Sequence, residues 1–305
     1  MMRLIIKGLS TLLLMALAFG VYYYAPGLNL LEWIQKQILG EEQAVIFESN
    51  ASPENLQIAT WNLCNFGKSK NEEELEYIAS QIKDFDIIGI QEVSTSAYGA
   101  KALAKLADAL NRTGNRWDYE LSDPTIGAGK ERYAFLWRPK RAKKIGKGWI
   151  LSEMESKFDR EPFLGRFQNV QGESLLLINF HAVPSKKKPE NEIVLLDQIH
   201  KKYVNDNLIL MGDFNLSESH LAFDNLKAMG YRAGLYDQAT TLKRKYGEGG
   251  VYLLNDHDNV FYERSAFLRK RCGVIDFVND FPDLKSARQV SDHLPIWIEV
   301  EWKAQ

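Results

Sequence analysis

The stretch LILMGDFN, Leu208 to Asn215, decides the fold of this chain. Its apolar run predicts a strand buried on both faces, and Gly212 interrupts the run so that Asp213 and Asn215 follow at the carboxyl end. Open α/β sheets place their chemistry at this end of the strands. Because a carboxylate and an amide two residues apart on an extended segment point the same way, they could hold a reactive water and a phosphate oxygen. A strand followed by an Asx turn would explain the same residues without a function.

Single polar residues also stand at the ends of other predicted strands. Asn62 and Glu92 follow two apolar runs early in the domain, and His181 closes the apolar run 175–180. A carboxylate at the mouth of an apolar strand is costly unless it meets a cation or a hydrogen-bond donor, so Glu92 is a candidate metal ligand. Each of these residues, taken singly, could instead cap a turn or be a hydrogen-bonded residue of the core.

The last quarter of the chain adds an aspartate and a histidine in similar positions. Asp258 lies just before the predicted strand 260–262, and His293 precedes the segment 294–302, whose alternation predicts a final strand with one face exposed. Two histidines and several carboxylates at strand ends are suited to in-line phosphoryl chemistry. One histidine would deprotonate water, another acid would protonate the leaving oxygen, and a divalent cation would offset the developing charge.

Helical spacing of apolar residues separates the predicted strands. Asn71 provides an N-cap and Glu74 its capping-box partner, so the segment 71–83 is predicted to be an amphipathic helix. The apolar stripe of 190–203 predicts another helix, with His200 on its surface. This alternation of strands and helices is typical of an α/β domain.

Composition gives no global attraction to nucleic acid. The 305 residues are 45% hydrophobic and 26% charged, enough for one large α/β core, and 38 basic against 40 acidic residues leave a net charge of −2. Any polyanion must therefore be bound by local basic runs such as 138–147, 186–188 and 243–245. A solvated surface explains each of these runs equally well.

The N-terminal segment is expected to lie outside the fold. Arg3 and Lys7 precede a charge-free stretch, 8–31, which is long enough to span a bilayer as a membrane anchor with its basic flank in the cytoplasm. A cleaved signal peptide is the alternative, and either one predicts export, as a membrane-anchored domain outside the cytoplasm or as a secreted or periplasmic protein. We expect three parts: an anchor or signal segment (1–27), a linker or stalk (28–54) and a catalytic domain (55–305).

Eight short motifs follow one another between Leu56 and Trp302: WN, QEV, ERYAFLWRP, DREP, NFHAVPS, GDFN, HDNVFY and SDHLP. The ordered set resembles the endonuclease/exonuclease/phosphatase superfamily, and within it the deoxyribonuclease I group. The resemblance covers nearly the whole predicted domain. It implies a four-layer α/β sandwich, in which two mixed β-sheets pack face to face with helices outside.

The resemblance also implies a magnesium site. Glu92 would be the Mg²⁺ ligand, with Asn62 nearby and Asp292 in support, and Mn²⁺ could replace Mg²⁺. The deoxyribonuclease I group has cysteine pairs beside its DREP-like and GDFN motifs, where this chain reads LSEMESKF and LSES. Neither of those two disulfides can form here, so the resemblance does not carry over a calcium-stiffened loop, and a role for Ca²⁺ is left open. Cys64 and Cys272 can form at most one disulfide.

The catalytic roles implied by the resemblance fall on two histidine–carboxylate pairs. His293 would be the general base, oriented by Asp258, and His181 would be the general acid or phosphate donor, oriented by Glu131. Such a pairing is physically sensible, because a carboxylate on one ring nitrogen fixes the tautomer and raises the basicity of the other nitrogen.

Substrate contacts are implied for four further positions. Asp213 and Asn215 would hold the water and the phosphate, and the Asn62 amide would lie near a metal-bound phosphate oxygen. Arg160 would contact the nucleic-acid backbone, since arginine grips phosphate bidentately. Ser94 stands where the deoxyribonuclease I group has an arginine, a change that would weaken groove binding.

Three classes of function remain open from the sequence. The first is a metal-dependent endonuclease that cuts DNA phosphodiesters with little sequence preference. The second is a sphingomyelinase-like or small-phosphoester phosphodiesterase acting near the membrane, although the loop after His181 is basic and only the segment 246–254 could enter a bilayer. The third is a catalytically silent binding module, which the filled acid, base and metal positions disfavour. No protein partner is indicated.

Overall fold

The computed structural model describes residues 52, 54–154 and 156–303. The chain divides into two compact units, 1–50 and 51–305, and only the second is described here. The expected anchor or signal segment and nearly all of the expected linker lie outside the described residues. Across the part of the chain that is described, no helix combines the length and the apolar character needed to cross a membrane.

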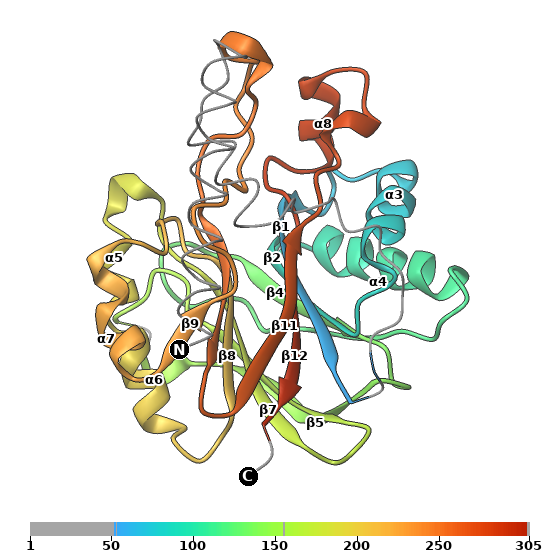
Figure 1. The fold of residues 1–305 in the computed structure, drawn as a ribbon. Coiled ribbons are helices and arrows are strands. Elements are labelled where there is room, and N and C mark those ends of the chain that lie inside the picture. The colour runs from blue at the N-terminus through green and yellow to red at the C-terminus, as the bar shows by residue number, and fades with distance from the viewer. Residues whose placement is uncertain (1–51, 53, 155, 304–305) are drawn as a thin grey trace, which may run out of the picture. The chain divides into compact units, whose positions relative to one another are not determined.

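The described chain forms two six-stranded sheets, as Figure 1 shows. The first sheet has the order β11-β12-β1-β2-β4-β3, with these bounds: β1 Leu56–Phe66, β2 Ile87–Val93, β3 Asp118–Leu121, β4 Arg132–Trp137, β11 Phe267–Val274 and β12 Ile296–Trp302. The second has the order β5-β6-β7-β8-β10-β9: β5 Ala142–Ile150, β6 Phe163–Asn169, β7 Ser174–His181, β8 Leu208–Asp213, β9 Tyr231–Ala233 and β10 Asp258–Glu263. Each sheet is mixed, because β1–β2 and β7–β8 run parallel while the other pairs are antiparallel.

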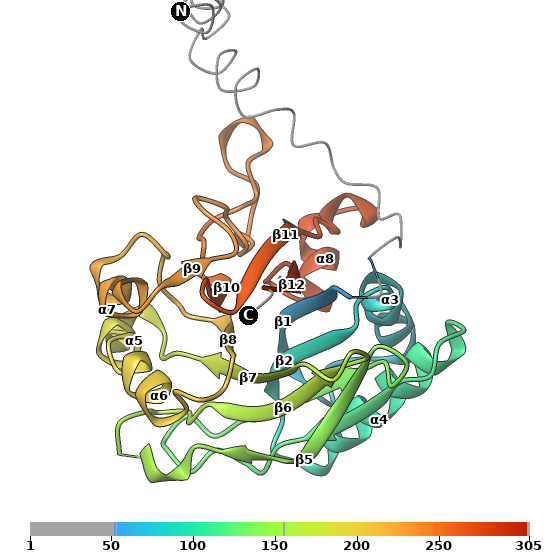
Figure 2. The same cartoon turned by 60° about the horizontal axis from the view of Figure 1, so that its bottom comes forward.

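Helices cover the outer faces of the two sheets (Figures 1 and 2). On the first sheet lie α3 (Glu72–Ile82) and α4 (Ala97–Arg112), and on the second lie α5 (Glu190–Ile193), α6 (Leu196–Lys202) and α7 (Asp224–Ala228). The last helix, α8 (Leu284–Val290), stands at one end of the sandwich. The predicted four-layer α/β sandwich is confirmed.

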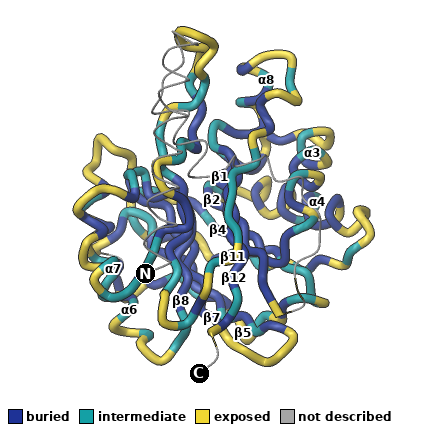
Figure 3. Tube along the Cα trace, viewed as in Figure 1, coloured by how far each residue is buried: buried dark blue, intermediate teal, exposed yellow. Residues whose placement is uncertain are grey.

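The apolar run 208–211 is buried on both faces, as predicted. In β8, Leu208 and Leu210 belong to the core between the second sheet and its helices, whereas Ile209 and Met211 belong to the core between the two sheets. β7 alternates in the same way. Every residue of β8 is buried, as is every residue of β7 except Ser174, and Figure 3 shows the buried stretch beside the β8 label. This is the burial expected of strands covered on both faces.

The helix predicted at 71–83 is confirmed, with its capping box intact. Asn71 accepts a hydrogen bond from the Glu74 backbone N–H, and the Glu74 side chain accepts one from the Asn71 backbone N–H. The helix predicted at 190–203, by contrast, is interrupted. It divides into α5 and α6 because ψ at Val194 and Leu195 is −18° and −9°, well short of the roughly −42° that an α-helix needs.

Three smaller expectations were wrong. β1 does not end before Asn62 but continues to Phe66, with a shift of register after Asn62. β12 has no exposed face. Glu299, on the face expected to meet solvent, is only 3% exposed, and its carboxylate accepts hydrogen bonds from Asn55, Gln57 and Arg271. His200 is half-buried, with its Nδ1 3.0 Å from the Tyr231 hydroxyl.

The close approach of β7 and β8 depends on Gly212. Its φ is +139°, and a Cβ at this position would lie 1.9 Å from the Phe180 carbonyl oxygen. Only glycine lets the two parallel strands stay paired up to the carboxylate of Asp213.

We predict that Gly212→Ala lowers the free energy of unfolding by more than the roughly 1–2 kcal/mol that a left-handed backbone alone costs. The additional loss comes from the clash with the Phe180 oxygen. Gly230→Ala is the matched control, because Gly230 has φ +95° but nothing within 4 Å of the added Cβ. Urea unfolding followed by circular dichroism measures both variants, and equal losses would contradict the steric argument.

Candidate active site

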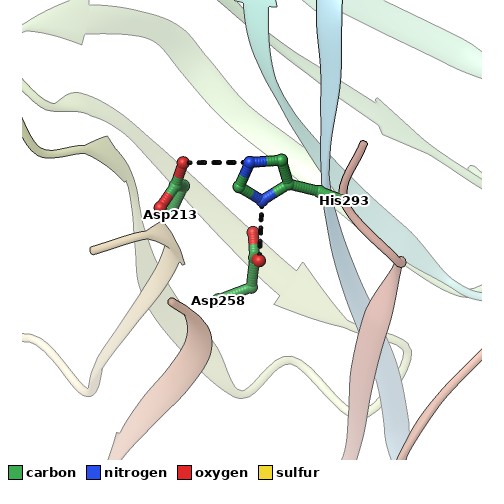
Figure 4. A group of neighbouring side chains, drawn as sticks. All are labelled: Asp213, Asp258 and His293. Carbon is green, nitrogen blue, oxygen red and sulfur yellow. Dashed lines mark hydrogen bonds and ion pairs between the residues drawn. The ribbon is translucent and has the colours of Figure 1, made fainter. Parts of the chain in front are cut away.

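The polar strand ends meet in one place. β1, β2, β7, β8 and β10 all bring their site residues to the same end of the sandwich, and the loop that precedes β12 adds a histidine. Among the described residues, Asp213, Asp258 and His293 offer potential ligand atoms that all lie within 4.8 Å of one another. Figure 4 shows the His293 ring between the two carboxylates.

Asp213 is the common point of this group. It is 1% exposed, and its Oδ2 lies 3.1 Å from the Asn62 Nδ2, 3.4 Å from the His181 Nε2 and 3.7 Å from the His293 Nε2. Burial alone would raise the pKa of this carboxyl, but the neighbouring His293 and His181 rings lower it. Asp213 is therefore an ionised carboxylate within reach of groups from both sheets.

His293 is oriented by a second buried carboxylate. Its Nδ1 lies 2.8 Å from the Asp258 Oδ2, which also accepts a 2.6 Å hydrogen bond from the Thr240 hydroxyl. The Nε2 is left facing Asp213 (Figure 4). Burial lowers the pKa of His293, but Asp258 and Asp213 outweigh it and raise the pKa to about 10. The sequence-based pairing of these two residues is thus present in the structure.

His181 has a similar arrangement with Glu131. Its Nδ1 lies 3.0 and 3.1 Å from the two Glu131 carboxylate oxygens, and its Nε2 faces Asp213. Burial lowers the pKa of this histidine and Arg160 lowers it as well, yet the Glu131 carboxylate leaves the pKa raised overall. Each histidine therefore has its own carboxylate on Nδ1 and shares Asp213 on Nε2.

The guanidinium of Arg160 makes most of its contacts with other groups of the protein. Its Nε donates to the His181 carbonyl oxygen at 3.2 Å, its Nη2 donates to the Ala182 carbonyl oxygen, and its Nη1 lies 3.5 Å from Glu131. The side chain is 12% exposed. The structure thus places Arg160 as a support for the His181–Glu131 pair, while the phosphate contact expected from the sequence stays a prediction.

Glu92 is joined to Asp213 through the side chain of Asn62. Its φ is +61°, its Oε1 accepts a 3.1 Å hydrogen bond from the Asn62 Nδ2, and its Oε2 accepts one from the Asn65 backbone N–H at 2.7 Å. The Asn62 amide nitrogen therefore links Glu92 to Asp213, and its oxygen accepts from the Cys64 backbone N–H. In this orientation the Asn62 oxygen does not face Glu92, so a metal-ligand role for Asn62 stays a prediction.

Asp292 is paired with a basic side chain. Its Oδ2 lies 3.0 Å from the Arg288 Nη2, one helical turn earlier. Burial, together with the charges of Asp292 and Glu92, raises the pKa of the Cys64 thiol to about 12. Both carboxylates thus act on the same half-buried thiol. Cys64 and Cys272 form no disulfide.

The donor chemistry of this side of the site fits a divalent cation. Glu92 and Asp292 provide carboxylate oxygens, which Mg²⁺ prefers. Lys70 is the neighbouring cation, but its Nζ donates to the Gln289 carbonyl oxygen at 2.8 Å, and burial lowers its pKa. The Asp213, Asp258 and His293 group also offers ligand atoms, but both of its imidazole nitrogens already face carboxylates.

Asn215 does not continue the strand as the sequence analysis assumed. Its φ is +50°, and its backbone N–H donates to the Asp213 Oδ1 at 2.8 Å, which makes an Asx turn. The side-chain Nδ2 donates to the Ala182 carbonyl oxygen at 3.0 Å and lies 3.4 Å from the Asp213 Oδ2. Asn215 therefore forms the Asx turn and still keeps its side-chain amide beside the Asp213 carboxylate.

Unusual backbone geometry marks the site, and sequence patterns did not reveal it. Six described non-glycine residues have positive φ, and four of them lie at these strand ends: Cys64, Asn65, Glu92 and Asn215. Such conformations cost energy and cluster at functional sites. Here they turn polar side chains out of strands that would otherwise bury them.

Sequence reasoning also missed three supporting residues. Thr240 holds Asp258, and the Ser291 hydroxyl donates to the Asn62 carbonyl oxygen at 2.6 Å while accepting from the His293 backbone N–H at 3.0 Å. His257 lies near enough to Asp213 to lower its pKa. Ser291 and His257 could have been suspected, because each lies within two residues of a predicted site residue in the SDH and HDN motifs.

Comparison with known proteins gives one consistent family. The sequence profile of the Endonuclease/Exonuclease/phosphatase family matches residues 59–293. Deoxyribonuclease-1-like 1 of Sus scrofa is 29% identical over 230 residues, which cover 70% of this chain and 70% of that protein. Deoxyribonuclease-1 of Bos taurus is 34% identical over 181 residues, which cover 55% of this chain and 63% of that protein, just under two-thirds.

A solved structure shares the fold. The mannosyl-6-phosphatase of Bacteroides thetaiotaomicron superposes with a TM-score of 0.59 at 21% sequence identity, over 82% of this chain and 100% of that one. Similarity at this level of identity shows a common architecture and says nothing about the substrate.

We predict that Asp258→Asn lowers the pKa of His293 in protein kept free of metal by a chelator. Removing the negative charge on Nδ1 destabilises the imidazolium, so the ring should lose its proton at lower pH than the roughly pH 10 of the wild type. The His293 Cε1–H resonance, titrated by NMR, measures this. Glu131→Gln is the control, since it removes the charge beside His181 and should leave the His293 midpoint nearly unchanged. An unaltered midpoint in Asp258→Asn would contradict the assignment.

Proposed function

Because the chain belongs to the endonuclease/exonuclease/phosphatase family, and is therefore a phosphoester hydrolase, we propose that it is a divalent-metal-dependent deoxyribonuclease. It would cut backbone phosphodiesters of DNA with little sequence preference. The observation that carries the proposal is the buried Asp213 carboxylate between two histidines, each held by its own carboxylate. The identity of 29% and 34% to two deoxyribonucleases supports DNA as the substrate.

His293 is proposed as the general base. Asp258 on Nδ1 keeps the ring in the tautomer whose Nε2 can take a proton from water, and Asp213 can orient that water from the other side. The same carboxylates raise the pKa of His293, so the ring must lose its proton before it can act. Activity should therefore rise with pH until His293 is neutral.

His181 is proposed as the acid. Glu131 raises the pKa of this histidine against the opposing effect of burial, which favours a protonated ring near neutral pH. A protonated Nε2 can donate to a phosphate oxygen or to the leaving oxygen. Arg160 holds the strand end that carries this ring through the carbonyl oxygens of His181 and Ala182.

Glu92 is proposed to hold the metal ion, with Asp292 in support. A divalent cation bound there would supply positive charge for the phosphate group as its negative charge grows. The oxygen donors suit Mg²⁺, and Mn²⁺ could replace it at the same ligands. The Asn62 amide nitrogen donates to both Glu92 and Asp213. It would therefore hold the proposed metal ligand, Glu92, in place relative to Asp213 and the two histidines.

Export is part of the proposal. The charge-free stretch 8–31 after two basic residues supports a segment that anchors the domain to a membrane or is cleaved as a signal. An exported domain could meet extracellular DNA. A sphingomyelinase-like or small-phosphoester activity is the alternative, and assays on supercoiled DNA, sphingomyelin and a generic phosphodiester would separate the two.

We predict that Glu92→Gln folds normally but loses about 10²–10³-fold in kcat, because one carboxylate ligand for the cation is removed. Chelation with EDTA should abolish wild-type turnover. Glu153→Gln is the control, since Glu153 forms an ion pair with Lys202 in another part of the chain. Full wild-type activity in excess EDTA would rule out the metal assignment.

A second prediction separates substrate binding from chemistry. His293→Ala should depress the cleavage of DNA and of bis(p-nitrophenyl) phosphate alike, because it removes the base common to both reactions. Arg160→Ala should reduce both through the His181–Glu131 pair but should reduce DNA cleavage more, if the exposed edge of the guanidinium reaches a phosphate of the polymer. The ratio of the two activities is the measurement. An unchanged ratio in Arg160→Ala would show that the residue acts only as a support.

A further inference from the structure

A projecting hairpin stands beside the site and is not used by the chemistry proposed above. Residues 241–254, called here the projecting hairpin, extend away from both sheets next to α8 (Figures 1 and 2). Backbone hydrogen bonds join its two sides, from Lys243 N to Tyr252 O at 2.7 Å and from Gly247 N to Val251 O at 2.8 Å. The hairpin is thus an ordered two-sided arm.

The base of the projecting hairpin is part of the wall of the active site. Thr241 forms a β-bridge with His293, and the Leu242 backbone N–H donates to the Asp292 carbonyl oxygen at 2.8 Å. The preceding residue, Thr240, holds Asp258. The arm therefore starts at the catalytic group and leads outward from it.

Two contacts brace the arm against the segment around α8. The Tyr252 hydroxyl donates to Asp276, and the Arg288 Nη1 donates to the Leu242 carbonyl oxygen at 2.5 Å. Arg288 also holds Asp292. These contacts hold the lower part of the arm in place, so the side chains farther along it keep a fixed position relative to the site.

The outgoing side of the arm is basic. Lys243 is half-buried, and Arg244 and Lys245 are exposed. Within residues 54–154 and 156–303, no carboxylate forms an ion pair with any of the three, whereas many other lysines and arginines of the domain do have such partners. The whole chain has a net charge of −2, so these three residues are a local concentration of positive charge, offset within the arm only by Glu248.

We propose that the projecting hairpin binds backbone phosphates of duplex DNA on one side of the cleaved bond, an inference that rests on the proposed deoxyribonuclease function. Arg244 and Lys245 follow three and four residues after Thr241, at a bend of the arm. They therefore lie beyond the catalytic group along the arm, where they meet phosphates to one side of the scissile bond.

The end of the arm does not suit insertion into a lipid bilayer. The residues farthest along it are Gly247, Glu248, Gly249 and Gly250, all exposed. Inserting Glu248 into hydrocarbon would be costly, and the glycines offer no apolar side chain in return. Of the exposed apolar residues of the arm, Tyr246 and Val251 flank this end, and Leu254 lies at the base.

The test compares two charge-reversed double variants of the full-length protein. Arg244→Glu with Lys245→Glu alters the hairpin, and Lys140→Glu with Lys143→Glu is the matched control. Lys140 and Lys143 are exposed and lie just before β5 and at its start. Replacing both with glutamate changes the net charge by the same amount as the hairpin substitutions. The hairpin variant should lose at least about tenfold in kcat/KM on plasmid DNA near 0.1 M salt, and the control much less. Both should cleave bis(p-nitrophenyl) phosphate as the wild type does.

A salt titration counts the contacts. For Arg244→Ala with Lys245→Ala, the slope of log(kcat/KM) on DNA against log salt should fall in magnitude by about 1.8, which is about 0.9 for each lost phosphate contact. Unchanged circular dichroism spectra and melting temperatures would show that the variants fold.

Three outcomes would overturn the inference, and they can be told apart. If the wild type cuts DNA but the hairpin and control variants behave alike, the arm does not bind DNA. If the hairpin variant loses binding to phosphatidylserine vesicles while DNA cleavage is unchanged, the arm binds an anionic membrane surface instead. If the wild type cleaves bis(p-nitrophenyl) phosphate but no DNA, the proposed function itself fails, and this inference fails with it.

Discussion

The buried carboxylate of Asp213 is the constraint on which the rest of the site depends. An ionised carboxylate removed from water is costly unless donors or positive charges surround it. Here the partners come from three separate parts of the chain: Asn62 from the first sheet, His181 from the second, and His293 from the loop before β12. The two sheets must therefore pack with these strand ends aligned, since any other arrangement would leave the charge without partners.

Charge is distributed in a regular way around this point. His181 and His293 each have a private carboxylate on Nδ1, Glu131 and Asp258, and both share Asp213 on Nε2. The excess of negative charge raises the pKa of both rings against the effect of burial. A histidine must be neutral to accept a proton. The proposed base function of His293 would therefore require either a nearby cation, which would lower the pKa of the ring, or a higher pH.

Alignment of the two sheets is also supported by a polar link buried between them. The Gln91 Nε2 donates to the Thr60 hydroxyl at 2.8 Å and to the Asn179 Oδ1 at 2.6 Å, while the Asn179 Nδ2 donates to the Ile90 carbonyl oxygen at 3.2 Å. Apolar contacts are non-directional, whereas a displaced amide would leave buried polar groups unpaired. Because Gln91 adjoins Glu92 and Asn179 lies two residues before His181, this link fixes the position of Glu92 relative to His181.

Local pattern was enough to predict the buried strands, the capped helix 72–82 and the strand-end positions of Glu92, His181, Asp213 and Asp258. Each of these depends on the periodicity or capping of a few neighbouring residues. Tertiary structure decided the burial of both faces of β12, the position of Asn62 and the inward use of Arg160. It also decided that residues 241–254 stand out beside the site. The first three features depend on partners 20 to more than 200 residues away in the chain, and the free energy of such contacts is not encoded in local pattern.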